Sequence, residues 1–410
     1  MGTAYDEPRT GPLARLAAVL TCAAAALALT ACEQHDESAK YARGELLSSE
    51  PLLSMDAAQA GDYVRQHGFD AAAVRFGVDA YRVLYRSTDD SGSDTVASGI
   101  AAFPRTQGDP ELPVTMYLHG TNPVRTAAAS VADSPDRAAV VLLAGSGRAT
   151  TAPDYQGLGL GRGAPAYLIA GPTVRTAVDG LTASRALAHQ QDRQLRRRVD
   201  VTGFSQGAHA AIPVARALQD GSDPQSSAGA VAAVAGPHDL FGTELEAALD
   251  GRLNPHEATL YLAYFTTSWN RTYHLYASPG EAFNPPYDRK TDALFDGSHS
   301  LDEIIPALPG SPGELLRPDF IRKLLHPSGN LARAVADNDD LCVGAHLHGP
   351  VKLFHGTADT DVAYANSERC RDSLAASGTQ VELVDAGSLD HTGTALSSFP
   401  AIAAWLEELS

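Results

Sequence analysis

Residues 198–219, RVDVTGFSQGAHAAIPVARALQ, pass from an extended segment through a glycine-flanked serine into an amphipathic helix. A serine on a sharp turn between a strand and a helix is held with its hydroxyl exposed. Gly203 and Gly207 suit such a turn, because the strand and the helix approach too closely to leave room for Cβ atoms. The alternative, a serine in an ordinary glycine-rich bend, is disfavoured by this context. The stretch therefore predicts a nucleophile at Ser205.

Short apolar strands and amphipathic helices alternate on both sides of this turn. We expect strands at residues 80–89, 95–104, 114–120, 149–155, 198–203, 228–236, 349–356 and 380–387. We expect helices at residues 56–68, 133–145, 173–190, 208–219, 367–378 and 399–409. This alternation predicts an α/β fold with a mostly parallel sheet and helices on both faces. The first two strands alternate apolar and polar residues, as an antiparallel hairpin does.

The alternation stops between residues 236 and 340, where the sequence is rich in aromatic residues, proline and helical pieces. Because strand–helix alternation resumes after this block, we interpret it as a helical cap inserted into the sheet domain. The predicted domain then consists of residues 55–235 and 341–410, with residues 236–340 as the cap.

The N-terminus has the layout of an export signal, because Arg9 and Arg15 precede a short apolar run at 16–32. The run ends in Leu29-Thr30-Ala31-Cys32, which resembles the lipobox of bacterial lipoproteins. The resemblance implies that residues 1–31 are removed, that Cys32 is acylated, and that the lipid anchors the chain outside the cytoplasmic membrane. Residues 32–54 are polar and predicted to be a flexible tether. The alternative is an ordinary signal peptide with an incidental cysteine.

The net charge disfavours one class of partner, and the cysteines indicate a covalent cross-link. The formal net charge of −18 disfavours nucleic acid as a partner. Cys342 and Cys370 lie in a domain predicted to be exported, where a disulfide persists. Neither cysteine has the neighbouring Cys or His of a zinc site, so we predict a disulfide between them. We expect no metal and no organic cofactor.

A serine nucleophile needs a base, and position selects His391 among the 14 histidines. It follows the last predicted strand and precedes the last helix, at the sheet edge where the serine turn also lies. His209 lies within the helix after Ser205, where a packing or hydrogen-bonding role is more natural. His346, His348 and His355 flank or end a strand and are weaker alternatives.

The acid that orients this base is expected after the preceding strand, in HGTADTDV at 355–362, which offers Asp359 and Asp361. Asp359 falls on the turn that reaches toward His391, whereas Asp361 is placed to cap the following helix or face solvent. Asp385 and Asp390 are near His391 in sequence, but neither follows the strand before the last one.

Stabilising the oxyanion of an acyl-transfer reaction requires backbone N–H donors near the serine. The N–H of Gln206 lies at the start of a helix, where it has no helical partner. The second donor is predicted at Thr121, in the glycine turn that ends the strand at 114–120.

Several motifs together resemble the secretory-lipase-like branch of the α/β-hydrolases. In order they are LPVTMYLHGT (112–121), APDYQGLG (152–159), GFSQGAHAA (203–211), AGPHDL (235–240), HGTADTDV (355–362) and the DHTG loop (390–393). The resemblance covers residues from about 75 to the C-terminus, including the cap. It differs at Ala208, where a further glycine is common, and in the absence of a proline after Val362.

This resemblance implies hydrolysis of a small-molecule or lipid carboxylic ester. Ser205, Asp359 and His391 would form the triad, and the amides of Thr121 and Gln206 the oxyanion hole. Two alternatives remain. One is a secreted serine peptidase or amidase of the same fold, which needs a charged group to fix its substrate. The other is a ligand-binding lipoprotein without catalysis.

Overall fold

The computed structural model describes residues 1–2, 42–108 and 111–409. Cys32 and the rest of the predicted signal, beyond its first two residues, lie outside this part of the chain. Within it, we find no helix with the length and apolar character needed to cross a membrane.

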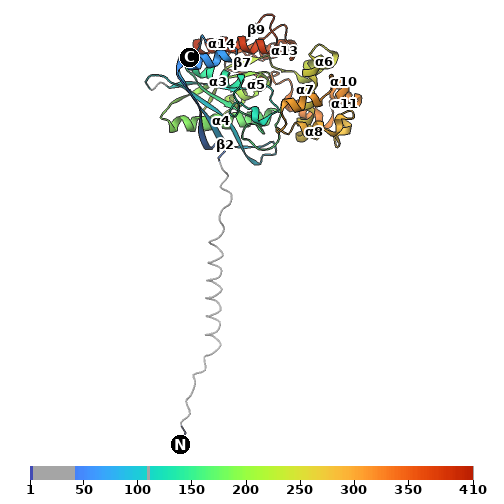
Figure 1. Cartoon of the computed structure of the whole chain (residues 1–410), viewed down its shortest axis with the longest axis horizontal. Helices are drawn as coiled ribbons and strands as arrows, with labels where there is room; N and C mark the ends of the chain where they lie inside the picture. The colour runs from blue at the N-terminus through green and yellow to red at the C-terminus, as the bar shows by residue number, and fades with distance from the viewer. Residues whose placement is uncertain (3–41, 109–110, 410) are drawn as a thin grey trace. The chain divides into compact units, whose positions relative to one another are not determined.

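A nine-stranded sheet organises the described residues from 43 onward, with the strand order β1-β2-β3-β5-β4-β6-β7-β8-β9. Figure 1 shows the sheet with helices around it. The strands are β1 Leu46–Met55, β2 Val78–Thr88, β3 Asp94–Pro104, β4 Leu112–Leu118, β5 Ala149–Pro153, β6 Leu195–Phe204, β7 Ser227–Val234, β8 Val351–His355 and β9 Val381–Asp385. β1, β2, β3 and β5 pair antiparallel in this order. β5, β4, β6, β7, β8 and β9 pair parallel in this order. The predicted mostly parallel sheet is confirmed.

Helices pack on both faces of the sheet, where the strands present apolar side chains. One face is covered by α2 Ala57–Gln66, α3 Pro135–Gly145 and α14 His391–Glu408. The other face is covered by α4 Ala170–Gln190, α5 Gln206–Gln219 and α13 Ala365–Ala376. The buried residues at these contacts are mostly Ala, Val and Leu, which allow helices to pack closely on a sheet.

Two boundaries differ from the sequence analysis. Residues 46–54, assigned there to the flexible tether, belong to β1 and pair with β2. Because β1 is an edge strand with mostly exposed or half-buried side chains, its apolar pattern is weak, and Pro51 is tolerated at the edge. In addition, α14 begins at His391, eight residues before the helix that the sequence predicted.

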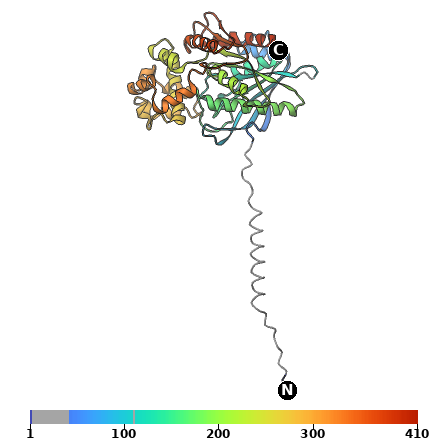
Figure 2. The ribbon, with the colours of Figure 1, turned by 180° about the vertical axis from the view of Figure 1, so that it is seen from behind.

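Between β7 and β8 the chain forms a helical cap, which gathers at one end of the sheet domain (Figures 1 and 2). Its helices are the π-helical turn Leu240–Glu244, α6 Leu245–Asp250, α7 Pro255–Tyr273, α8 Thr291–Leu294, α9 Leu301–Ile304, α10 Pro312–Leu315, α11 Pro318–Leu325 and α12 Gly329–Asn338. Short 3-10 turns lie at Arg125–Ala127 before the cap and at Pro279–Glu281, Tyr287–Arg289 and Ile305–Ala307 within it. Large aromatic side chains, among them Trp269, Tyr264 and Phe295, form its fully buried interior.

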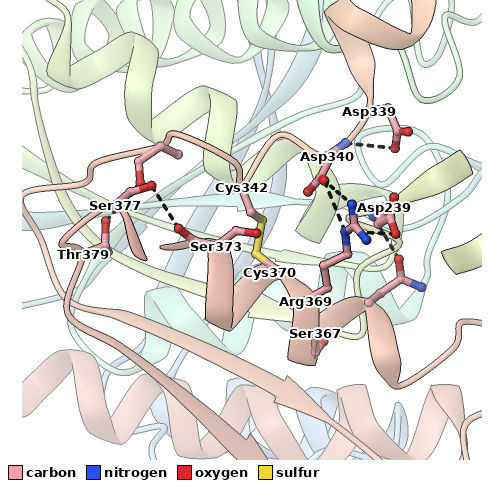
Figure 3. The surroundings of a disulfide bond; sticks show 12 residues. Asp239, Asp339, Asp340, Cys342, Ser367, Arg369, Cys370, Ser373, Ser377 and Thr379 are labelled. Carbon is pink, nitrogen blue, oxygen red and sulfur yellow. Dashed lines mark hydrogen bonds and ion pairs between the residues drawn. A yellow bond between two sulfur atoms is a disulfide. The ribbon is translucent and has the colours of Figure 1, made fainter. Parts of the chain in front are cut away.

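The two ends of the cap meet at its base beside α13. Arg369 of α13 forms ion pairs with Asp239, before the first cap helix, and with Asp340, after the last one (Figure 3). Next to these ion pairs, Cys342 and Cys370 form the predicted disulfide, with their Cα atoms 5.2 Å apart. The disulfide therefore fixes the chain leaving the cap to a helix of the sheet domain.

Candidate active site

Ser205 lies in the turn between β6 and α5 with a φ of 54°, a conformation that is strained for a residue with a side chain. Its N–H donates to the Val234 carbonyl at 2.8 Å, which fixes the turn to β7. A Cβ atom on Gly203 would lie 2.3 Å from the Gly207 carbonyl oxygen, and one on Gly207 would lie 2.0 Å from that of Leu118. Both glycines are therefore required by the close approach of β6, α5 and β4.

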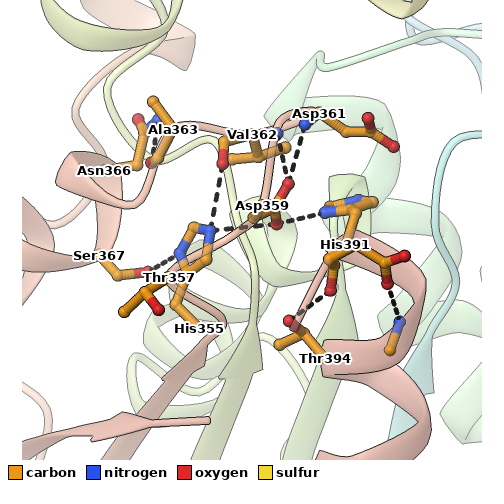
Figure 4. A network of polar contacts seen from close by, with 12 residues as sticks. His355, Thr357, Asp359, Asp361, Val362, Ala363, Asn366, Ser367, His391 and Thr394 are labelled. Atoms are coloured by element: carbon orange, nitrogen blue, oxygen red, sulfur yellow. Dashed lines mark hydrogen bonds and ion pairs between the residues drawn. The ribbon is translucent and has the colours of Figure 1, made fainter. Parts of the chain in front are cut away.

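His391 and Asp359 meet at the same edge of the sheet (Figure 4). The Nδ1 atom of His391 lies 2.7 Å from the Asp359 Oδ2 atom, so a proton on Nδ1 is donated to the carboxylate. The other carboxylate oxygen, Oδ1, accepts the N–H groups of Asp361 and Val362 at 2.9 and 3.0 Å. This arrangement leaves Nε2 of His391 to act as a base.

Asp359 has a further contact, His355, which the sequence does not predict. His355 is fully buried, and its Nε2 atom lies 3.2 Å from Asp359 Oδ2, while its Nδ1 atom lies 2.7 Å from the Ser367 hydroxyl. A neutral His355 satisfies both contacts when Ser367 donates to Nδ1 and Nε2–H donates to the carboxylate. Its place at the end of β8 was the available signal, but nothing in the sequence shows which way the ring points.

The hydrogen bonds to Asp359 outweigh the effect of its burial. Burial alone would raise the pKa of this carboxyl, but the hydrogen bonds from His355 and His391 and the N–H of Val362 hold the pKa well below its ordinary value. Asp359 therefore stays ionised and can stabilise a positive charge on His391.

The other histidines considered from the sequence have different surroundings. The His209 Nε2 atom lies 2.8 Å from the Asn338 carbonyl oxygen in the last cap helix, and burial lowers the pKa of this imidazole to about 4. His346 and His348 precede β8 and therefore lie at the opposite sheet edge from Asp359.

The remaining acids also have separate partners. Asp390 caps α14 by accepting the N–H of Gly393, and Asp385 accepts the N–H of Gly387. Asp361 contributes its N–H to Asp359, while Asp359 alone of these acids is hydrogen-bonded to His391.

Thr121 and Gln206, the predicted oxyanion donors, both lie near Ser205. Gln206 is the first residue of α5 and follows Ser205 directly. Thr121 lines the same cavities as Ser205, and its hydroxyl lies 3.1 Å from the Tyr167 hydroxyl. Tyr155, from the APDYQGLG segment, donates its hydroxyl to the His119 carbonyl at 3.0 Å and thereby supports the loop that carries Thr121.

Ser205 lies where two cavities meet. We call the first the cap cavity; it is lined by Thr121, Tyr167, Leu168, Ser205, Pro237, Leu240, Phe241, Glu244, Leu245, Ala248, Leu253, Ala258, Tyr261, Leu262, Phe265 and Val362. The second, the histidine cavity, is lined by Phe69, Tyr117, Gly120, Thr121, Pro135, Asp136, Phe204, Ser205, Tyr261, Asp361, His391, Thr392, Ala395, Leu396 and Phe399. Both cavities share Ser205, Thr121 and Tyr261. No hydrogen bond joins Ser205 to His391 in the described part of the chain, but both side chains face the histidine cavity.

The cap cavity is apolar except for hydroxyl groups and one carboxyl, that of Glu244. Burial raises the pKa of Glu244 to about 7, although hydrogen bonds from the Ala363 N–H and the Asn366 amide oppose the shift. A single glutamate in a helical region has no distinguishing pattern, so the sequence does not predict a role for Glu244.

One group of side chains in the described residues has the ligand atoms and spacing to share a metal ion, namely His238, Cys342 and Cys370. The two sulfur atoms of this group are joined in the disulfide, so they are not thiolate ligands in this state.

No family model matches the chain, and no curated protein matches its sequence. Solved structures do match its fold. The rice cell wall degrading esterase LipA from Xanthomonas oryzae, in a ligand-bound form, is 23% identical with a TM-score of 0.79, over 90% of this chain and 99% of that chain. A candidate hydrolase from Legionella pneumophila is 23% identical with a TM-score of 0.80, over 88% of this chain and 97% of that chain.

Candida antarctica lipase A is a more distant match, at 13% identity and a TM-score of 0.61, over 86% of this chain and 78% of that chain. At these identities the likeness establishes the architecture and leaves the reaction to be argued from the site. The nine-stranded sheet, the serine turn after β6 and these structural matches show that the chain has the α/β-hydrolase fold.

Proposed function

We propose that the protein is an extracytoplasmic serine hydrolase of carboxylic esters, with Ser205, His391 and Asp359 as its catalytic triad. The observation that carries the proposal is that a serine, a histidine and a carboxylate lie together at one sheet edge. A strained serine turn opens into the same cavity as a histidine, whose other nitrogen is hydrogen-bonded to a buried carboxylate. Esterase and lipase structures among the fold matches support the same reaction class.

In the first half of the reaction, Nε2 of His391 takes the Ser205 proton as the serine oxygen attacks the ester carbonyl. The charge that develops on the carbonyl oxygen is held by the N–H groups of Gln206 and Thr121. Asp359 stabilises the imidazolium and keeps Nδ1 protonated. The intermediate then collapses, the alcohol leaves with the proton from His391, and an acyl-enzyme ester remains on Ser205.

The two cavities indicate how the ester is oriented. The leaving alcohol must receive its proton from His391, which lines the histidine cavity and not the cap cavity. The alcohol therefore occupies the histidine cavity, and the acyl group extends from Ser205 into the apolar cap cavity. In the second half, water enters from the vacated histidine cavity, loses a proton to His391, and releases the acid.

Kinetics with p-nitrophenyl esters of increasing acyl length, beside aminoacyl p-nitroanilides, test the reaction class. We expect turnover of the esters by the wild type and loss of turnover in Ser205→Ala, which removes only the nucleophilic oxygen. Cleavage of the anilides without cleavage of the esters would assign the protein to the amidases instead.

We further propose that the mature chain begins at Cys32 and is held at the membrane by a lipid on that cysteine. Metabolic labelling with a palmitate analogue in a bacterial host should label the wild type and not Cys32→Ser. The matched control is Cys22→Ser, which removes the other cysteine of the same segment and should keep the label. Labelling of Cys32→Ser would contradict the proposed anchor.

A further inference from the structure

Glu244 is the one carboxyl on the wall of the cap cavity, whose floor contains the nucleophile. It ends the π-helical turn Leu240–Glu244, at the point where the cap begins. Its Oε2 atom accepts hydrogen bonds from the Ala363 N–H at 3.1 Å and from the Asn366 amide at 2.7 Å. Ala363 lies in the loop after Asp359 and Asn366 in the first turn of α13, so one side of this carboxyl is bound to the segment that follows Asp359.

The other side of the carboxyl has no such partner. Oε1 of Glu244 makes no hydrogen bond with any described residue, and Glu244 keeps part of its surface accessible at the cavity wall. Nor does a lysine, arginine or histidine of the described chain form an ion pair with this carboxyl. A carboxylate among apolar side chains is costly unless a cation or strong donor compensates for its lost hydration. The raised pKa of Glu244 has the same cause.

Aromatic side chains line the same cavity as Glu244. Tyr167, Phe241, Tyr261 and Phe265 line the cap cavity together with it. Aromatic faces attract cations through their quadrupole, and the effect is strongest where water is excluded. A carboxylate and several aromatic rings in one cavity match an ammonium group better than an unsubstituted alkyl chain.

We propose that the cap cavity selects esters whose acyl group carries an ammonium group, and that Glu244 is the residue that binds it. The inference rests on the proposed ester hydrolysis and on the assignment of the acyl group to this cavity. The ester carbonyl would lie at Ser205, and the acyl chain would place the ammonium group between Glu244 and the aromatic wall. Glu244 acts here in specificity and takes no part in bond breaking.

The test compares methyl esters by pH-stat titration at about pH 8, where Glu244 is mostly ionised and an alkylamine is still protonated. The substrates are the methyl esters of β-alanine, 6-aminohexanoic acid and 8-aminooctanoic acid. Each is paired with the ester in which a methyl group replaces the ammonium group. Methyl 6-hydroxyhexanoate shows whether a neutral hydrogen-bonding group is sufficient.

Glu244→Gln is the informative variant, because it keeps an oxygen for the Ala363 N–H and Asn366 and removes the charge. At one chain length at least, the wild type should prefer the amino ester in kcat/KM by roughly 10- to 100-fold, the range expected for a hydrogen-bonded ion pair. Glu244→Gln should lose this preference and still hydrolyse the alkyl ester. Glu246→Gln, on the exposed side of α6, is the control and should keep the wild-type preference.

Two results would overturn the inference while the proposed function stands. One is hydrolysis of alkyl or hydroxy esters in preference to amino esters at every length. The other is a preference for amino esters that Glu244→Gln retains. If no ester is hydrolysed, the proposed function fails, and thermal shifts with n-hexylammonium and 1-hexanol decide separately whether Glu244 binds an ammonium group. Stabilisation by hexylammonium in the wild type, absent in Glu244→Gln, would support this binding; equal shifts would overturn it.

Discussion

The sheet domain and the cap contribute different groups to the surroundings of Ser205. The sheet domain supplies the groups of the proposed triad: the serine turn after β6, the acid after β8 and the histidine after β9. The cap supplies most of the wall along which the acyl group would lie, through the π-helical turn, α6 and α7. The proposed chemistry and the proposed selectivity therefore belong to separate parts of one chain.

The two parts are also packed differently. Helices on the sheet are buried through aliphatic side chains, as in α3, where the Ala, Val and Leu side chains from Ala138 to Ala144 are fully covered. The cap has no sheet to pack against and fills its interior with large rings, such as Trp269 against Phe265 at a centroid distance of 4.4 Å. Close packing of aliphatic side chains holds the sheet edge within narrow limits, whereas single side chains of the cap line the cavity beside Ser205. Changes in the sheet domain should therefore abolish turnover, and changes in the cap should redirect it.

Among changes that leave Ser205 in place, the largest effect is expected from Asp359→Asn. Without the carboxylate, Nδ1 of His391 loses its acceptor and the imidazolium its stabilising charge, a defect on the order of 10⁴-fold in turnover in a well-studied serine protease. We expect kcat for a p-nitrophenyl ester to fall by several orders of magnitude. The loss should be far larger than in Asp361→Asn, which keeps the N–H that Asp359 accepts. The reverse ranking would show that the acid is misassigned.

A cap substitution should change preference instead. Ala258 of α7 lines the cap cavity, so Ala258→Phe would fill part of the space proposed for the acyl chain. Excluding about three or four methylene groups costs roughly 0.8 kcal/mol each, so the kcat/KM ratio of octanoate to acetate esters should fall roughly 100-fold. Ala277→Phe, at an exposed position of the cap, should leave the ratio as in the wild type. An unchanged ratio in Ala258→Phe would show that the acyl group does not occupy this cavity.

The disulfide connects the two parts, and its loss should be visible in stability. Closing a loop with a sequence separation of 28 residues contributes roughly 3 to 4 kcal/mol, mainly by restricting the unfolded chain. The double variant Cys342→Ser, Cys370→Ser should therefore unfold at lower denaturant concentration than the oxidised wild type. Two free thiols in the non-reduced wild type would rule the bridge out.

The smallest effect is a pH dependence from Glu244. Its pKa is about 7 in the folded protein and near the ordinary 4.5 when unfolded, so the unfolded state loses its proton first as the pH rises. The stability contributed by this group is complete below about pH 4.5 and is lost as the pH rises through 7. Glu244→Gln has no carboxyl to titrate at this position. The melting temperature of Glu244→Gln minus that of the wild type should therefore increase as the pH rises from 4.5 to 8. A constant difference would contradict the raised pKa.

Local motifs made the sheet domain predictable. Gly203 and Gly207 mark the serine turn within five residues, and His391 is selected by following the last strand. The position of α5 behind the serine follows from its apolar spacing. The mostly parallel sheet follows from the alternation of strands and helices. In each case the signal lies within one element and its neighbour.

What the sequence did not reveal depends on contacts between distant residues. His355 meets Asp359 because of how a short loop folds back, and Glu244 reaches the Ala363 N–H across 119 residues. β1 is stabilised by backbone pairing with β2, which leaves little trace in an exposed edge strand. The two cavities on either side of Ser205 arise from several elements together, and no single motif encodes them.

The central claim is that Ser205 is the nucleophile at this sheet edge, and covalent labelling tests it most directly. The wild type and Ser205→Ala would be treated with a small serine-directed phosphonate, and the modified residue would be located by peptide mass spectrometry. We predict a single adduct on Ser205 in the wild type and none in a folded Ser205→Ala variant. An adduct on another serine, or labelling of Ser205→Ala at the wild-type rate, would contradict the claim.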